Sequence, residues 1–310
     1  MQNNVSDNRD LTVVIPAYRC APFLPAAVLS AVACGPAAVL IAEDASGDET
    51  ASVARELAIS SRSLVSLTEN TSNLGMTANW RKAFDRVNTP LALKLDGDDI
   101  VNPNYVSAAM QLMRRQADMA VVGGRLTGIH KDSFINAMPN HAAVTSGSFR
   151  VYSGLDALQF CLNWKPVPCS SSMLFRMEAY RRVNGFEKRL GWCPDREIWF
   201  RLARIGKIAV CDDTSSYYRT LDSSVTAKTI RSDRQCFEHS TMVRLAAAIW
   251  REPEAIPLLQ NALVRTGGSL IKSAWRSSVS GRIGEAPTRL AKGAADLILA
   301  ATLARSSRCA

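Results

Sequence analysis

Short apolar runs recur along the first half of the chain, separated by longer stretches of mixed polarity. The runs fall at 11–16, 37–42, 64–68, 91–95 and 119–126. Apolar runs of about four to eight residues that are rich in β-branched side chains are typical of strands covered on both faces. We therefore predict a strand at each of these positions.

The stretches between the runs carry helix signals. They predict helices at 23–34, where Pro25 is tolerated in the first turn, and at 49–60, 76–87 and 103–116. Strands that alternate with helices through short connections are typical of an α/β protein. The predicted fold is a mostly parallel sheet flanked by helices on both faces.

Polar loops follow three of the predicted strands, after Pro16, Ala42 and Leu95. In a parallel sheet the carboxyl ends of the strands meet at one edge, and ligands bind beyond that edge. The chain has neither GxGxxG nor GxxxxGK[ST], so a dinucleotide fingerprint and a P-loop are excluded. The pattern predicts a ligand site of another kind at this edge.

The loop after Leu95 reads Asp96-Gly97-Asp98-Asp99. Carboxylates placed this closely repel one another and need a counter-charge. Mg²⁺ or Mn²⁺ supplies it, takes oxygen ligands and keeps positions open for substrate phosphates. The cluster therefore predicts a divalent metal shared with a diphosphate. The alternative is an acidic turn that caps the next helix, since Asp and Gly are common turn residues.

Composition limits the classes of protein that fit. With 310 residues, 47% hydrophobic and 21% charged, the chain is globular and long enough for one large α/β core with an appendage or for two small domains. No apolar run approaches the ~18 residues that span a bilayer, and the polar start lacks a signal-peptide core, so we expect a cytoplasmic protein. Eight scattered cysteines without a CxxC pair and three histidines give no zinc pattern.

The carboxyl-terminal part is basic. The formal net charge is +9, and 265–308 carries eight Lys or Arg residues against two acidic ones. Helices are predicted at 237–250, 256–275 and 290–303. We expect them either to lie on anionic lipid at the inner face of the cell membrane, or to pack on the rest of the chain with a solvated basic face. Nucleic acid is not an expected partner, because no reader motif is present and the basic residues lack interleaved aromatics.

Six segments, in this order and spacing, resemble the family 2 glycosyltransferases, which have the GT-A fold: VVIPAYRCAPFLPAAVLSAV, IAEDASGDET, NLGMTANWRKAF, LKLDGDDIVNPNYV, SSMLFRMEAYRRVNGFE and PDREIWFRLARIG. The resemblance runs from about Leu11 to Val225. It implies transfer of a sugar from a nucleotide diphosphate sugar to a hydroxyl acceptor with inversion, in the assembly of surface or exported glycans. The acceptor would be a glycan or a lipid-linked compound.

The resemblance also implies a domain organisation. A GT-A catalytic domain would span 1–226, with a nucleotide-sugar half at 1–127 and an acceptor half at 128–226. The basic segment 227–310 would form a small helical extension.

The acidic loops would hold the donor in this family. Asp44 would accept a hydrogen bond from the base, and Asp96 would face the ribose hydroxyls. Asp98 would ligate the metal that bridges the two phosphates, with Asp99 as a neighbour or second ligand. Carboxylates accept hydrogen bonds from ring N–H and O–H groups, so these roles fit their chemistry.

The first loop and a later segment complete the implied donor site. Pro16, Ala17 and Tyr18 would contact the nucleotide, although Arg19 stands where the family usually has Asn.

The later segment is YRTLDSSVT at 218–226. It carries Leu221 where relatives have a His that can help hold the metal or the diphosphate, and Arg219 would supply compensating charge.

The motif that begins at Pro194 would supply the general base. Asp195 would remove the proton of the acceptor hydroxyl, with Pro194 in place of the family's Glu. Glu197 or Glu187 is the alternative base. Trp192 would stack on the acceptor sugar or serve as a core or rim aromatic.

Two other functions fit parts of the pattern. A sugar-phosphate nucleotidyltransferase shares the metal and the nucleotide, but would show a Gly-rich, basic phosphate loop after the first strand, whereas 17–24 has one Arg and no Gly. A catalytically inactive nucleotide-sugar binding module fits the departures at Pro194 and Leu221. Release of diphosphate from a labelled nucleotide sugar separates a transferase from such a module.

Overall fold

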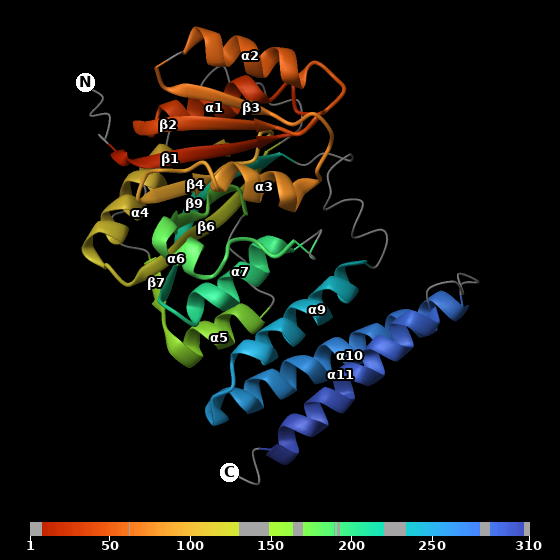
Figure 1. The fold of residues 1–310 in the computed structure, drawn as a ribbon. Coiled ribbons are helices and arrows are strands. Elements are labelled where there is room, and N and C mark those ends of the chain that lie inside the picture. Colours follow the sequence, from red (N-terminus) through yellow and green to blue (C-terminus); the bar gives the residue numbers. More distant parts are fainter. Residues whose placement is uncertain are drawn as a thin grey trace.

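Figure 1 shows the computed structural model, which describes residues 8–61, 63–129, 149–163, 170–188, 190, 193–219, 234–279 and 286–306. The strands are β1 (Asn8–Ala17), β2 (Pro36–Glu43), β3 (Val65–Glu69), β4 (Leu91–Lys94), β5 (Ile100–Val101), β6 (Met119–Ile129), β7 (Phe149–Tyr152), β8 (Leu174–Arg176) and β9 (Lys207–Arg219). The helices are α1 (Leu24–Val32), α2 (Thr50–Ser60), α3 (Met76–Phe84), α4 (Pro103–Arg115), α5 (Gly154–Leu162), α6 (Met177–Arg182), α7 (Pro194–Ala203), α9 (Arg234–Ile249), α10 (Ile256–Val279) and α11 (Ala286–Ser306).

The strands form one sheet in the order β3-β2-β1-β4-β8-β6-β9-β5, with β7 paired to β9. The first four in this order are parallel, so the carboxyl ends of β1, β2 and β4 lie at one edge. Beyond β4 the sheet is mixed, because β8 is antiparallel to both β4 and β6, while β6 and β9 are parallel. The predicted α/β class is confirmed, and its parallel character is concentrated in the half that carries the acidic loops.

All five predicted strands are present, as β1, β2, β3, β4 and β6. The sequence analysis did not predict β5, β7, β8 and β9. Three of these are two to four residues long, too short to show a period, and β9 has polar residues over 212–216. Their pairing partners, which lie far away in the sequence, stabilise them as strands.

The two faces of the sheet pack into two apolar clusters, because successive strand residues point to opposite faces. In β1, Val13 and Ile15 face a cluster built with α1, α2 and α4. Val14 faces the other cluster, which contains residues of α3, α5 and α7 and also of α9, α10 and α11. The carboxyl-terminal helices therefore share a core with the sheet.

The predicted carboxyl-terminal helices are present as α9, α10 and α11 (Figure 1). The indole N–H of Trp250 donates to the carbonyl of Phe200 in α7 at 3.2 Å, and Arg265 donates to the carbonyl of Leu162 at the end of α5. The helices thus pack on the rest of the chain, as one of the two alternatives predicted. None of the helices among the described residues is long and apolar enough to cross a membrane. The division at 226 and 227 stays a prediction.

Candidate active site

Asp44, at the end of β2, is held by internal hydrogen bonds. Its carboxylate accepts from the backbone N–H groups of Leu74 and Gly75 at 2.8 and 3.0 Å, and from the Asn70 side-chain amide at 2.8 Å. A carboxylate accepts about four hydrogen bonds, so one position is left for a ligand donor. Asp44 is only 2% exposed, and its contacts also fix the polar loop over 70–75.

The first loop leaves β1 beside Asp44. Tyr18 is 47% exposed and therefore accessible to a ligand, whereas Ala17 is buried. Arg19 has φ of 51°, its N–H donates to the hydroxyl of Ser46 at 3.1 Å, and its guanidinium lies over the Tyr18 ring. Asn adopts this left-handed backbone more readily than Arg, which gives a physical reason for the usual family residue there.

Asp96, just after β4, is paired with a buried cation. The Lys94 ammonium is fully buried, lies 2.5 Å from an Asp96 oxygen and sits 3.8 Å above the Trp80 ring centroid. The Ser170 hydroxyl donates to the other Asp96 oxygen at 3.1 Å, and the Asp96 N–H donates to Ser171 at 2.9 Å. The Asp96 side chain keeps about a quarter of its surface exposed, at 26%, so it remains accessible to a ligand.

Asp98 and Asp99 carry the strongest electrostatic perturbation at this edge. Burial and then the Asp96 carboxylate raise the pKa of Asp98 to about 6, against the opposing charges of Lys94 and Arg219. Burial, followed by Asp98 and Asp96, also raises the pKa of Asp99 well above its ordinary value. The positive charge near these two carboxyls is therefore too small to offset their burial and mutual repulsion.

Arg219, at the end of β9, lies against this pair. Its backbone N–H donates to Asp99 Oδ1 at 3.0 Å, and its side-chain Nε donates to the Asp98 carbonyl at 3.1 Å. The Asp99 Oδ2 atom is buried and has no partner at normal hydrogen-bond geometry. The Ser171 hydroxyl is nevertheless near enough to lower the pKa of Asp99 somewhat. β9 was not predicted from the sequence, and it places Arg219 beside Asp98 and Asp99.

The chemistry of these carboxylates fits a divalent cation whose remaining ligands are substrate phosphates. Within the described ranges, no group of three or more His, Cys, Asp and Glu side chains is arranged to hold a metal unaided. Asp98 and Asp99 nevertheless offer hard oxygen ligands, a deficit of positive charge and one unsatisfied buried oxygen. Mg²⁺ sites of this kind use one or two carboxylates, with phosphates and water supplying the other ligands. Leu221 lies outside the described residues.

Gly97 joins the acidic loop to the first loop without space for a side chain. Its N–H donates to the Pro16 carbonyl at 3.2 Å, and an added Cβ would lie 2.8 Å from the Cys20 sulfur and 3.1 Å from the Pro16 oxygen. The backbone contact with Pro16 cannot be relieved by rotating a side chain. Gly97 therefore fixes the position of Asp96 and Asp98 relative to β1.

We expect Gly97→Ala to lower kcat/KM by about tenfold or more, since small displacements of catalytic groups have large effects, and to lower the free energy of unfolding by about 1–3 kcal/mol. Gly128→Ala is the matched control, because a Cβ there meets nothing within 4 Å. Steady-state kinetics and thermal unfolding of both variants test this. Wild-type kinetics of Gly97→Ala would contradict the packing argument.

Asp195 joins this edge from a distant part of the sequence. Pro194 begins α7, so Asp195 lies in the first turn, half-buried. Burial raises the pKa of the Asp195 carboxyl and the nearby Asp96 carboxylate adds to the rise, while Arg196 and Lys94 oppose it. The Asp195 carboxyl is therefore within electrostatic reach of the acidic loop. Trp192 lies outside the described residues.

Glu197, the alternative base, is placed differently. It is 3% exposed and its carboxylate is paired with the Arg201 guanidinium, with one N–O distance of 2.7 Å. A carboxylate held in a buried ion pair is a poor proton acceptor.

Lys94 is the principal site residue that sequence reasoning did not assign. It appeared there only as an interruption of an apolar run. A lysine inside a buried strand is rarely found without a partner, so its position could have indicated a charged ligand or a paired carboxylate. Which carboxylates it faces depends on the tertiary structure.

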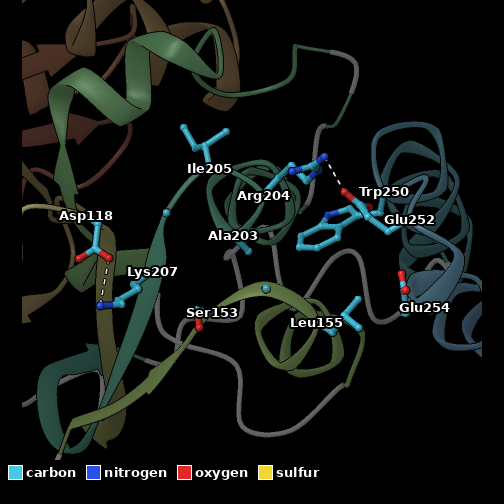
Figure 2. Close-up of a pocket in the computed structure, with 12 residues that line it drawn as sticks. Asp118, Ser153, Leu155, Ala203, Arg204, Ile205, Lys207, Trp250, Glu252 and Glu254 are labelled. Atoms are coloured by element: carbon cyan, nitrogen blue, oxygen red, sulfur yellow. Dashed lines mark ion pairs between the residues drawn. The ribbon is translucent and has the colours of Figure 1, made fainter.

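A separate pocket of about 390 Å³ lies at the opposite edge of the sheet, where β6 and β9 begin (Figure 2). Its charged side chains form internal pairs, with Asp118 and Lys207 at 3.0 Å and Arg204 and Glu252 at 2.5 Å. None of the predicted site residues lines it. The candidate active site is therefore at the carboxyl edge.

The fold and this edge define a class of protein. A sheet with parallel β1–β4, an acidic loop after β4 and a carboxylate at the start of a later helix form the framework of GT-A glycosyltransferases. Residues 12–183 match the family model described as "Glycosyl transferase family 2", which is more than half of the chain. The chain belongs to this family. The matched segment ends before Asp195.

Solved structures of glycosyltransferases share this fold. S. aureus TarS in complex with UDP has a TM-score of 0.60 at 14% identity, covering 96% of this chain and 91% of that one. The mannosyltransferase PcManGT from Pyrobaculum calidifontis, in complex with GDP-Man and Mn²⁺, has a TM-score of 0.57 at 17% identity, covering 97% and 88%. No curated protein sequence matches the chain.

Proposed function

We propose that the protein transfers a sugar from a nucleotide diphosphate sugar to a hydroxyl acceptor, with inversion at the anomeric carbon and with Mg²⁺ or Mn²⁺. The observation that carries this proposal is that Asp195, in the first turn of α7, lies within electrostatic range of Lys94 and Asp96, at the edge that also holds Asp98 and Asp99. A binding module would need the acidic loop alone. A transferase also needs a proton acceptor beside it, and Asp195 supplies one.

The donor is held mainly by the loops after β1, β2 and β4. Tyr18 contacts the nucleotide together with Pro16 and Ala17, Asp44 accepts from the base, and Asp96 accepts from the ribose hydroxyls. The exposure of Tyr18 and of part of Asp96 supports these contacts. TarS was solved with UDP and UDP-GlcNAc and PcManGT with GDP-Man, which favours a nucleoside diphosphate sugar as the class of donor.

Asp98 and Asp99 hold the cation, and Arg219 lies beside them as a second source of positive charge. When bound, such a cation neutralises the negative charge that develops on a diphosphate leaving group. Arg219 offers the same kind of stabilisation from the protein itself.

Asp195 takes the proton of the acceptor hydroxyl. Burial raises the pKa of this carboxyl, which makes it a better proton acceptor, while Arg196 and Lys94 oppose the rise. With the base on the acceptor side, the acceptor oxygen attacks the face opposite the leaving group in one displacement. This stereochemistry gives inversion. Trp192 is proposed to contact the acceptor.

A panel of UDP-, GDP- and dTDP-sugars tests the function. Each donor is incubated with the protein and Mn²⁺ or Mg²⁺, with hydroxyl acceptors added or omitted, and released nucleotide and glycosylated product are measured. Acceptor-dependent release with one donor supports a transferase. Binding of a donor without release in any combination would favour the inactive binding module instead.

We further propose that the acceptor belongs to surface or exported glycan assembly and that the carboxyl-terminal helices rest on the cytoplasmic leaflet. Trp275 is 68% and Ile298 67% exposed, and Lys272 and Arg276 are exposed beside Trp275 on α10. Aromatic and aliphatic side chains with neighbouring cations suit an anionic membrane surface.

We expect the protein to sediment with vesicles containing phosphatidylserine at low salt and to be released as salt screens the attraction, because surface charges interact within a Debye length. Trp275→Ala together with Ile298→Ala should weaken the binding. Neutral phosphatidylcholine vesicles are the control. Equal sedimentation with both lipids, or none with either, would contradict the proposal.

A further inference from the structure

The carboxylate of Glu238 joins the start of α7 to the carboxyl-terminal helices. Glu238 on α9 is 6% exposed, and its Oε2 atom accepts a hydrogen bond from the backbone N–H of Cys193 at 3.3 Å. Cys193 is the residue immediately before α7, and its carbonyl accepts from the N–H groups of Arg196 and Glu197. Glu238 thus holds the residue from which the first turn of α7 is built.

Within this first turn Glu197 is paired with Arg201, but the residue that precedes the turn provides no side-chain cap. The Cys193 side chain makes no capping hydrogen bond, and Pro194 has no N–H to donate. The free N–H groups at a helix start need acceptors, and a carboxylate placed there also interacts favourably with the helix dipole. Asp195 follows directly in this turn. The direction of its side chain therefore depends on the groups that hold Cys193.

The segment just after α9 also contacts the later part of α7, at the end away from Asp195. The Trp250 indole donates to the Phe200 carbonyl in the later part of α7. Glu252 pairs with Arg204 just after the helix, at the edge of the sheet opposite the candidate active site (Figure 2). Glu238 is the contact at the end of α7 that carries the base.

Charged groups from several elements surround Glu238. Lys292 on α11 is close enough to interact with it, and the Lys292 ammonium also contacts the Thr241 hydroxyl at 2.5 Å. On the next position of α9, His239 is buried near Arg196. The charge that adjoins the start of α7 is therefore that of Glu238, with Lys292 near it, because burial lowers the pKa of His239 to about 3 and leaves its imidazole neutral near pH 7.

We propose that Glu238 is a positioning residue for the general base, and that the carboxyl-terminal helices form part of the catalytic apparatus through this contact. The inference rests on the proposed function. The inference also accounts for the departure at Pro194. The family carries an acidic side chain next to the base in the motif, and this chain has Pro194 there. Glu238 on α9 provides an acidic side chain at the same end of α7. Glu238 acts through the backbone of Cys193 and does not contact substrate.

Three variants test this role. Glu238→Ala removes the acceptor, Glu238→Gln keeps a carbonyl oxygen that can accept from Cys193, and Glu252→Ala removes the matched contact at the other end of α7. We expect Glu238→Ala to lower kcat about 10- to 100-fold with donor KM unchanged, because misplacing a catalytic group impairs the chemical step more than binding. Glu238→Gln should stay within about threefold of wild type, and Glu252→Ala should retain wild-type kcat.

Hydrogen–deuterium exchange supplies a readout that does not require turnover. Glu238→Ala should raise exchange in the peptide that contains 193–197, and Glu252→Ala should not. If Glu238→Ala shows faster exchange at 193–197 but the wild-type protein turns over no donor, the contact is supported and the proposed function is wrong.

Three outcomes would overturn the inference. They are wild-type kcat in Glu238→Ala, an equal loss in Glu252→Ala, and failure of Glu238→Gln to restore kcat although it unfolds at the wild-type temperature.

Discussion

Asp98→Ala is expected to lower kcat by about 10³-fold or more. A cation at a diphosphate contributes several kcal/mol of charge stabilisation, and about 1.4 kcal/mol corresponds to a factor of ten. The fold should persist, because the variant removes one member of a self-repelling group of carboxylates, in which burial and Asp96 raise the Asp98 pKa. Stability near neutral pH should therefore stay the same or rise. Turnover and thermal unfolding are measured on the same preparation.

The control for this variant is Asp118→Ala. Asp118 pairs with Lys207 at the opposite edge of the sheet, so its loss changes the protein's net charge by the same amount without touching the site. Chelation gives an independent test: EDTA should abolish wild-type turnover and added Mn²⁺ or Mg²⁺ should restore it. Full activity in excess chelator would show that the acidic loop does not serve a metal.

Asp195→Asn is expected to lower kcat by about 10²-fold or more while donor KM is retained. The amide keeps the size and most hydrogen bonding of the carboxylate but cannot accept the proton, and general base catalysis typically contributes about 10²–10⁴-fold. Wild-type kcat should also fall at low pH. Because burial raises the Asp195 pKa, protonation removes the base at a higher pH than for an ordinary aspartate. This acidic limb should be absent from the residual activity of Asp195→Asn.

Glu197→Gln is the discriminating comparison. Breaking its buried pair with Arg201 should lower the unfolding temperature, yet the folded enzyme should keep most of its kcat. The anomeric configuration of the product, read by NMR, tests the mechanism: inversion is expected. Retention of configuration, or near wild-type turnover by Asp195→Asn, would remove Asp195 from the role of base.

The sequence alone was sufficient for β1 to β4, β6 and α1 to α4 of the nucleotide half and for the acidic loops, although not for the two-residue β5. Hydrophobic periodicity is a local property, and β1 to β4 with α1 to α4 follow from it within a few residues. The placement of three polar loops at one edge followed from parallel topology, which short helical crossovers favour. The carboxylates after β4 were identified because their mutual repulsion is evident from spacing alone.

Only the tertiary structure decided which groups meet. The antiparallel insertion of β8 between β4 and β6, and the path of β9 to Arg219, depend on pairing between segments far apart in the sequence. The position of Asp195 within electrostatic range of Lys94 and Asp96 and the contact of Glu238 with Cys193 are of the same kind. Each joins residues on different elements, or sets the direction of a buried charge. Local sequence patterns carry no information on such contacts, because their energy arises only when the packed core brings the groups together and excludes water.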